Sequence, residues 1–436
     1  MVDAKQIALR IFRETLAHIE IPLAFERRIS RFGNRILVDD WSCALSGFAD
    51  IRVVALGKAA HAMLQGFAQL FAESRFTGVA SAPGPPTDVL PGISYFVGGH
   101  PLPNEQSFLA GKAALGLLQN CTQNSLVIFL LSGGGSALME LPLEQRQSLD
   151  DFRSLNQILV TCGASIDEIN AIRKHASAIK GGRLAIAAEK ATKVTFAISD
   201  VPPGKEAALA SGPSIPDPTT TADVSRILDH YNLREKLPAS LREWFASDAL
   251  LETPKKNHPA FASSHFFLLL TSHDLFHAAH HAAEAEGFVT CCDNSTDDWP
   301  LDRATDFLLA QLEDLRRSNP GQRVAVISDG EVSSAVTGQG IGGRNSAFAL
   351  ACVEKIAGKP IAVLSAGTDG IDGNSPAAGA IADGTTLSRA LEQNLSPRDF
   401  FRRSDSFTFF QKLGDDIITG PSGNNLRDLR ILLALP

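Results

Sequence analysis

The sequence predicts an α/β protein with parallel β-sheet structure, and three observations lead to this prediction. Short apolar runs, several of them rich in β-branched residues, alternate along the chain with helical segments. The runs lack the polar alternation of a half-exposed strand, and this is typical of strands covered by helices on both faces. Nearly all of them end in Gly, Ser or Asp, which favour the turns that lead into helices.

Six runs are the predicted strands: IRVVALG from Ile51, SLVIFLLSGGG from Ser125, KVTFAISD from Lys193, FFLLLTS from Phe266, RVAVISDGE from Arg323 and PIAVLSAGTDG from Pro360. An amphipathic helix precedes them in MVDAKQIALRIFRETLAHIE, and other helices follow glycine turns such as those at Gly57 and Gly343. In open α/β sheets, ligands bind at the carboxyl ends of the strands, where loops and helix N-termini expose N–H groups. We therefore expect the chemistry in these loops.

The length of 436 residues predicts two or three domains, at about 150 residues each. The segment 238–264 lacks a clear strand, carries three prolines and two adjacent lysines, and separates two α/β series. Such a segment is typical of a linker between domains. We place the boundary near residue 255, which gives domains over 1–255 and 256–436.

Charge and cysteine content argue against several classes of protein. The chain has 40 Lys and Arg against 48 Asp and Glu, a net charge of −8, so it lacks the positive field that holds nucleic acid or an anionic membrane. The N-terminal helix carries charges throughout, unlike a signal peptide or membrane anchor. Six cysteines without a C-x-x-C pair are interpreted as buried residues in a reducing compartment. We expect a cytoplasmic protein.

A triple-glycine loop follows the strand from Ser125 and comprises Ser132, Gly133, Gly134, Gly135 and Ser136. Without Cβ atoms, the backbone can curl so that consecutive N–H groups converge on an oxyanion, and the two serines add hydroxyl donors. This pattern favours an anion-binding loop. The alternative is a flexible turn without a ligand.

A second glycine-rich loop, TGQGIGGRN, ends in Gly342, Gly343, Arg344 and Asn345. It lacks both the acidic residue about 20 positions later that completes a dinucleotide site and the G-K-[ST] ending of a P-loop. Arg344 lies at the predicted start of a helix, where its guanidinium can bind a phosphate or carboxylate in a bidentate manner. The alternative for Arg344 is a solvated surface position.

Lys58 and Asp200 each follow a predicted strand. A lysine there is costly to desolvate without an anion, and Lys58 could neutralise a phosphoryl group during its transfer. Asp200, held in the turn SDVPPG, suits a general base toward a hydroxyl or a partner for Lys58. Asp369 and Asp372 form a second acidic pair that could hold Mg²⁺. Solvation of the lysine and local turn hydrogen bonds of the aspartates are the alternatives.

The histidines and the lack of a serine nucleophile motif also bear on the chemistry. His100 and His175 are candidates for substrate contact, whereas the four histidines within 273–281 lack the order of a zinc motif, and we reject a metal site there. No G-x-S-x-G nucleophile elbow stands in a strand-turn-helix setting. Glycine-rich loops combined with Lys, Arg and Asp indicate phosphoryl transfer, in which catalysis is largely positioning and charge neutralisation.

The sequence as a whole resembles the glycerate 2-kinase family that carries a MOFRL domain, some of whose members are called hydroxypyruvate reductases. The matching stretches are, in chain order, GKAAHAM, GGHPLPNEQS, LSGGGSALMELP, GASIDEINAIRKHASAIKGGRLA, ISDVPPG, ASGPSIPDPTT, TGQGIGGRNSAFALA and AGTDGIDGNSPAAGAIADGTT. The resemblance implies a larger Rossmann-like N-terminal domain, a smaller α/β C-terminal MOFRL domain, and a cleft between them.

The resemblance also implies that ATP and Mg²⁺ phosphorylate D-glycerate at its 2-hydroxyl to give 2-phosphoglycerate. The family's active-site lysine, aspartate and arginine fall on Lys58, Asp200 and Arg344. We expect Asp200 and Asp369 to hold the metal, in a monomer or homodimer. The expected phosphate and nucleotide contacts are Ser132, Gly133, Gly134, Gly135, Ser136, Glu331, Gly342, Gly343, Asn345 and Asp369.

Three stretches depart from the family pattern: SDVPPG replaces SDVPGD, SDGEVS replaces SGGETT, and GPSGNN replaces GPTGTN. Pro203 precedes a position where the family aspartate is lost. Asp329 adds a negative charge near the expected nucleotide site and predicts an altered nucleotide or substrate preference, while Glu331 and Asp428 remain as nearby acids. Two alternatives are an NAD(P)H-dependent hydroxypyruvate reductase, disfavoured by the missing ribose-binding acid, and a non-catalytic sugar-acid binding protein.

Overall fold

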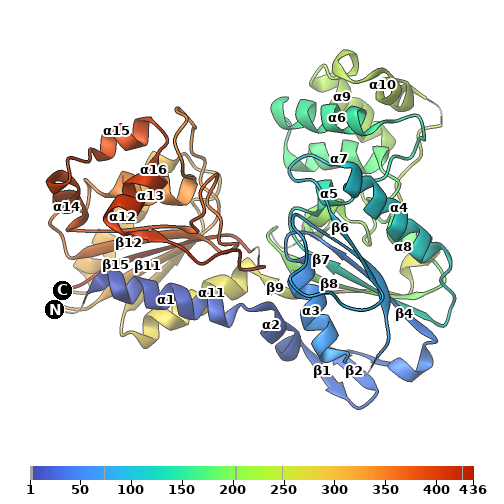
Figure 1. Ribbon diagram of the computed structural model, residues 1–436, viewed down its shortest axis with the longest axis horizontal. Helices are drawn as coiled ribbons and strands as arrows, with labels where there is room; N and C mark the ends of the chain where they lie inside the picture. Colours follow the sequence, from blue (N-terminus) through green and yellow to red (C-terminus); the bar gives the residue numbers. More distant parts are fainter. Residues whose placement is uncertain (1–2, 73, 202–203, 248, 425) are drawn as a thin grey trace. The chain divides into compact units, whose positions relative to one another are not determined.

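The computed structural model describes residues 3–72, 74–201, 204–247, 249–424 and 426–436 (Figure 1). The chain forms two compact units. We call Ile21–Leu269 the parallel-sheet unit. The mixed-sheet unit combines the N-terminal residues through Glu20 with Leu270–Pro436.

This division differs from the predicted boundary at residue 255. The predicted linker contains α10 (Ala239–Ala246) and the turn η4 (Pro259–Phe261), and it buries Leu241 and Phe245 in the parallel-sheet unit. The first helix, α1 (Ala4–His18), belongs to the mixed-sheet unit, where its apolar face packs against α11 (Ser272–Ala285). The periodicity of α1 predicts that one face is buried but not which surface buries it.

The parallel-sheet unit is built on a six-stranded sheet of order β6-β5-β4-β7-β8-β9. Its strands are β4 (Asp50–Leu56), β5 (Thr77–Ala82), β6 (Ile93–Val97), β7 (Ser125–Leu131), β8 (Thr192–Ser199) and β9 (Ser264–Thr271). Neighbouring strands from β6 through β8 pair in parallel, and the register aligns Leu56 with Leu131 and Leu131 with Ala197. The carboxyl ends of β4, β7 and β8 therefore meet at one edge, as predicted.

Helices cover this sheet and form a further layer. The helices are α2 (Ile21–Arg28), α3 (Ala60–Leu70), α4 (Glu105–Gln119), α5 (Gly135–Leu138), α6 (Leu149–Thr161), α7 (Ile166–Ala176), α8 (Arg183–Ala187), α9 (Thr221–His230) and α10. Helices α6, α7, α9 and α10 gather around their own apolar cluster, which includes Phe152, Ile172 and Leu228 (Figure 1). A three-stranded antiparallel ribbon precedes the main sheet, formed by β1 (Ile29–Phe32), β2 (Arg35–Val38) and β3 (Trp41–Ala44).

The mixed-sheet unit has a six-stranded sheet of order β10-β11-β15-β12-β13-β14. Its strands are β10 (Val289–Asp293), β11 (Val324–Asp329), β12 (Ile361–Gly367), β13 (Gly379–Asp383), β14 (Asp416–Ile417) and β15 (Asp428–Ala434). Strand β15 is antiparallel to both β11 and β12, so this sheet is mixed although its central strands are unbroken apolar runs. The α/β fold class is confirmed.

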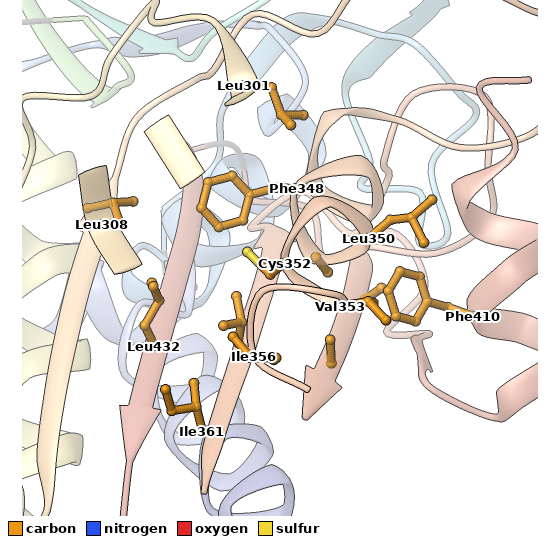
Figure 2. Packing of buried hydrophobic residues seen from close by; sticks show 14 of the residues in the cluster. Leu301, Leu308, Phe348, Leu350, Cys352, Val353, Ile356, Ile361, Phe410 and Leu432 are labelled. Atoms are coloured by element: carbon orange, nitrogen blue, oxygen red, sulfur yellow. The ribbon is translucent and has the colours of Figure 1, made fainter. Parts of the chain in front are cut away.

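The core of this unit lies between the sheet and its helices, which are α12 (Leu301–Ser318), α13 (Arg344–Cys352), α14 (Thr386–Glu392), α15 (Pro397–Arg402) and α16 (Ser406–Leu413) in addition to α1 and α11. Figure 2 shows Phe348 and Phe410 of the helices packed with Ile361 and Leu432 of the strands. The six cysteines are free, but Cys292 on β10 is exposed, so the prediction that all of them are buried is wrong for it. Within the described residues, no helix is long and apolar enough to cross a membrane.

Candidate active site

The first group of predicted site residues lies at the carboxyl ends of β4 and β7. The Lys58 N–H donates to the carbonyl oxygen of Gly133 over 2.9 Å, and the Ala59 N–H donates to Ser132 Oγ over 3.0 Å. Ser132 is fully buried, and its own N–H bonds to Leu56 at the end of β4. The backbone of the lysine turn is therefore fixed directly onto the triple-glycine loop.

The side chains of Lys58 and His100 both lie against Gly134. A Cβ atom added there would lie 3.0 Å from His100 Nε2 and 3.1 Å from Lys58 Cγ. The loop therefore needs glycine at this position for the Lys58 stem and the His100 ring to lie over it, and its φ of 78° is in the left-handed region. Desolvation and the charge of Lys58 both lower the pKa of His100, which favours a neutral ring beside the loop.

Gly57 makes the contact between the two turns possible, and Gly57→Ala tests it. Its φ is 125°, and an added Cβ would lie 2.2 Å from Ser132 Oγ. We expect the substitution to lower the free energy of unfolding by about 2–4 kcal/mol, from backbone strain and overpacking. Urea unfolding measures the change.

Gly116→Ala is the matched control in the same unit, because no heavy atom lies within 4 Å of an added Cβ on this residue of α4. Its unfolding free energy should stay unchanged or rise by up to about 1 kcal/mol. Equal effects of the two substitutions would show that the two turns do not depend on this contact.

The far end of the loop is tied to helix α7. Ser136 Oγ lies 2.8 Å from Ser211 Oγ, and Ser211 donates to Asn170 Oδ1 over 3.0 Å.

Asp200 follows β8, the strand next to β7, and is partly exposed at the same edge of the sheet. Pro203, the first departure from the family pattern, lies outside the described residues. His175, by contrast, is fully buried with Nδ1 2.8 Å from the carbonyl oxygen of Ala171, so the structure does not open it to a substrate.

The second group of predicted residues lies in the mixed-sheet unit, around Arg344. Its Nη1 donates to Glu331 Oε2 over 2.7 Å and its Nε to Asp428 Oδ2 over 2.5 Å. Burial opposes the charge, but these two carboxylates raise the pKa of Arg344. Glu331 follows β11 and Asp428 opens the antiparallel strand β15, so both lie at the end of the sheet beside the first residue of α13.

The N-terminus of α13 is capped by a carboxylate from the neighbouring loop. Asp372 is buried and accepts from the N–H groups of Asn345 and Ser346 over 2.9 and 2.8 Å. A Cβ on Gly343 would lie 2.3 Å from Asp372 Oδ1, so this position needs glycine. Gly342 precedes it with a φ of 154°. Asp372 therefore caps the helix. This agrees with the alternative given above for Asp369 and Asp372, in which such an aspartate makes local hydrogen bonds and does not bind Mg²⁺.

Asp369 is the member of that pair that lies with the Arg344 group. A Cβ on Gly367 would lie 3.1 Å from Asp369 Oδ1 and 3.4 Å from Asp428 Oδ1, so the two carboxylates flank the end of β12. Asp369 is partly exposed, whereas Asp428 is buried and paired with Arg344. A carboxylate such as that of Asp369 fits Mg²⁺, which kinase sites hold through one or two carboxylates together with phosphates. Within the described residues, no group of three or more His, Cys, Asp and Glu side chains could hold a metal by itself.

Asp329, the second departure, is the last residue of β11 and is buried, with no hydrogen-bond partner for Oδ1 among the described residues. Burial raises the pKa of Asp329, while the charges of Arg427 and Arg430 oppose this rise. Sequence reasoning missed its charged neighbours. Asp297 accepts from the Glu331 N–H over 2.8 Å and pairs with Arg427, and the buried Arg430 donates to the carbonyl oxygen of Gly330. Asp297 lies in a connecting loop without a glycine motif, so no local pattern marks it.

Two family models match the chain. A domain of unknown function, DUF4147, matches residues 7–246, and the MOFRL family matches residues 324–428. The first model includes most of α1, which groups with the other unit in the structure.

Curated relatives match between 77% and 99% of the chain. A glycerate 2-kinase of Pyrococcus horikoshii is 33% identical over 99% of this chain and 98% of its own length. A D-glycerate 2-kinase of Thermotoga maritima is 34% identical over 87% of this chain and 89% of its own. A putative hydroxypyruvate reductase of Agrobacterium vitis is 36% identical over 77% of this chain and 76% of its own.

Solved structures agree with this similarity. The crystal structure of glycerate kinase from Thermotoga maritima has a TM-score of 0.84 and 30% identity, with 99% of both chains covered. A Pyrococcus horikoshii protein has a TM-score of 0.80 and 32% identity, with 100% of this chain and 99% of the other covered. The chain, in which a DUF4147 domain is followed by a MOFRL domain, therefore belongs to the glycerate 2-kinase family.

Proposed function

We propose that this protein is a glycerate 2-kinase that transfers the γ-phosphoryl group of ATP to the 2-hydroxyl of D-glycerate. The observation that carries the proposal is the direct bonding of the Lys58 turn to the triple-glycine loop at the carboxyl edge of a parallel sheet. A cation beside close-packed glycines is what phosphoryl transfer requires, because its catalysis depends on positioning and on neutralising charge. The glycerate 2-kinase relatives of similar length support the same reaction.

The residues of the parallel-sheet unit have distinct proposed roles. Lys58 neutralises charge on the migrating phosphoryl group, and the N–H and hydroxyl groups of Ser132–Ser136 hold its oxygens. Asp200, at the end of the next strand, orients the 2-hydroxyl and takes its proton as the bond to phosphorus forms. Ordering all of these groups on one sheet edge reduces the entropy lost on reaching the transition state.

Arg344 has a supporting role in the proposed mechanism. Because Glu331 and Asp428 already hold its guanidinium, the side chain is fixed before a phosphate reaches it. Gly342, Gly343 and Asn345 bring the backbone of the same loop close to the nucleotide. Asp200 in the parallel-sheet unit and Asp369 in the mixed-sheet unit are the carboxylates that we propose for Mg²⁺. A bound Mg²⁺ would neutralise charge on the phosphate oxygens.

The substitution Arg344→Lys tests this role. Lysine keeps the positive charge but lacks the planar guanidinium group, which can bond to two carboxylates and a phosphate at once. We therefore expect kcat/KM to fall by about 100-fold. Arg398→Lys is the matched control, because Arg398 makes a bidentate pair with Glu354 on an exposed surface of the same unit. Steady-state kinetics that give the same small loss for both variants would remove Arg344 from the mechanism.

An ADP-release assay with D-glycerate, L-glycerate and hydroxypyruvate tests the function itself, and a parallel assay follows NADH absorbance with hydroxypyruvate. We expect ATP-dependent turnover with D-glycerate and no oxidation of NADH. The reductase alternative is not favoured, because the 337–345 loop lacks the acidic residue of a dinucleotide site. NADH oxidation without ADP release would favour the reductase, and glycerate binding without either activity would favour a binding protein. The cleft, the cytoplasmic location and the oligomeric state stay predictions.

A further inference from the structure

Arg173 on α7 is a guanidinium without a carboxylate partner. Among the described residues, no acidic group forms an ion pair with it, and its Nε is sealed from solvent with no hydrogen-bond acceptor. The side chain as a whole is only partly buried, so a ligand can reach the remaining N–H groups. Desolvation lowers the pKa of Arg173, yet a guanidinium stays charged in proteins.

Glu140 is the acid whose charge acts on Arg173, and other groups already engage both of its oxygens. Its Oε1 accepts from Ser177 Oγ over 2.5 Å and from the Leu141 N–H over 2.9 Å, and its Oε2 accepts from the buried Lys180. One carboxylate therefore faces two cations, Lys180 and Arg173, which leaves one positive charge in excess. A desolvated charge without a partner is costly, and an anionic ligand would offset that cost.

Arg173 lies one helical turn beyond Asn170, the residue of α7 to which the Ser136 end of the loop is connected. The hydroxyl chain from Ser136 through Ser211 ends at Asn170, and Arg173 is three residues further along α7, on the same face of the helix. Lys58 is bonded instead to the loop's other end, near Ser132 and Gly133. One end of the triple-glycine loop is thus bonded to the turn that carries Lys58, and the other end is connected through Ser211 to the helix that carries Arg173.

We propose that Arg173 binds the carboxylate of the 2-hydroxy acid that accepts the phosphoryl group. This inference rests on the proposed function, which assigns the Lys58 end of the loop to the phosphoryl group. A guanidinium binds a carboxylate through two parallel N–H···O bonds, which orients the acid as well as attracting it. The hydroxyl next to that carboxylate is then held toward the loop.

The test compares Arg173→Met and Arg173→Gln with the wild type, using D-glycerate and its uncharged amide as acceptors. We expect the KM for D-glycerate to rise at least about 30-fold in both variants while the KM for ATP stays within about threefold. The preference of the wild type for the acid over the amide should disappear. Arg183→Met is the matched control, because Arg183 also has sealed N–H groups but faces Asp217. Its acid-to-amide preference should be unchanged.

Calorimetric titration of D-glycerate separates the two proposals. Wild-type binding that Arg173→Gln abolishes supports the carboxylate site even if no phosphoryl transfer occurs, and in that case only the proposed function fails. A rise in the KM for ATP alone would show that Arg173 contacts the nucleotide and would overturn the inference. Unchanged binding of D-glycerate in a variant with wild-type thermal stability would also overturn it.

Discussion

Replacing Lys58 by Met is expected to lower kcat for glycerate phosphorylation by about 1,000-fold with little change in the unfolding midpoint. Methionine keeps an unbranched apolar stem against Gly134 but removes the only charge that the Lys58 turn supplies to the loop. Loss of a single preorganised group that stabilises transition-state charge costs about 100- to 1,000-fold in kcat. The backbone bonds of the turn to Ser132 and Gly133 do not depend on the side chain, so the fold should persist.

Steady-state kinetics and thermal unfolding check this expectation. Lys112→Met on α4 is the control, because Lys112 is an exposed lysine of the same unit. Its kcat should match the wild type. If Lys58→Met retains more than about one third of the wild-type kcat, then Lys58 does not act on the phosphoryl group.

Replacing Lys174 by Met is expected to lower the free energy of unfolding by about 3–5 kcal/mol. Lys174 Nζ lies 3.0 Å from Asp217 Oδ1, and both side chains are buried. Thr219 and Thr253 donate to the other oxygen of Asp217 over 2.6 and 2.9 Å, so the substitution leaves a buried carboxylate that keeps its hydroxyl donors but loses its ion-pair partner. Breaking a buried pair by removing one partner has a cost of this size.

The pH dependence of stability gives a second measurement on this pair. Burial alone would raise the pKa of Asp217, but Lys174 and the hydroxyl donors lower it below its ordinary value. The ionised Asp217 carboxylate therefore stabilises the fold at pH values above its unfolded-state pKa. This stabilisation is lost as the pH falls through the folded-state pKa of Asp217. The substitution should weaken this loss of stability on the acid side, which urea unfolding between about pH 3 and pH 7 would record.

Lys205→Met is the control for both measurements, because Lys205 pairs with Asp167 at 2.7 Å and both side chains are about half exposed. Exposed pairs contribute at most about 1 kcal/mol. If Lys174→Met lowers the free energy of unfolding by no more than Lys205→Met does, then the buried Lys174–Asp217 pair does not stabilise the fold.

The sequence predicts the central strands well, because buried parallel strands are unbroken apolar runs. Strands β4, β7, β8, β11 and β12 all follow this rule. Strand β6 is partly exposed along its length and β5 contains Gly78, so neither forms such a run. The apolar pattern of β15 does not indicate its direction either. Its antiparallel pairing with β11 and β12 makes the second sheet mixed.

The candidate site is predicted only in part, for a related reason. Glycine-rich turns after strands mark Lys58, the triple-glycine loop and Arg344, because close backbone approach requires glycine at particular positions. Contacts between distant segments leave no such local mark. The capping of α13 by Asp372 and the hydrogen bond that the Glu331 N–H donates to Asp297 both join segments more than 25 residues apart, and only the tertiary structure brings them together.

A proton-coupled phosphorus NMR spectrum of the product distinguishes phosphoryl transfer from ATP to the 2-hydroxyl of glycerate from transfer to the 3-hydroxyl. A phosphate on the 2-oxygen is split into a doublet by the single proton on that carbon, whereas one on the 3-oxygen is split into a triplet by two protons. We expect a monoester doublet that grows as ATP is converted to ADP. A triplet would show transfer to the 3-hydroxyl, and inorganic phosphate as the sole new signal would show hydrolysis of ATP. Either result would rule out transfer to the 2-hydroxyl.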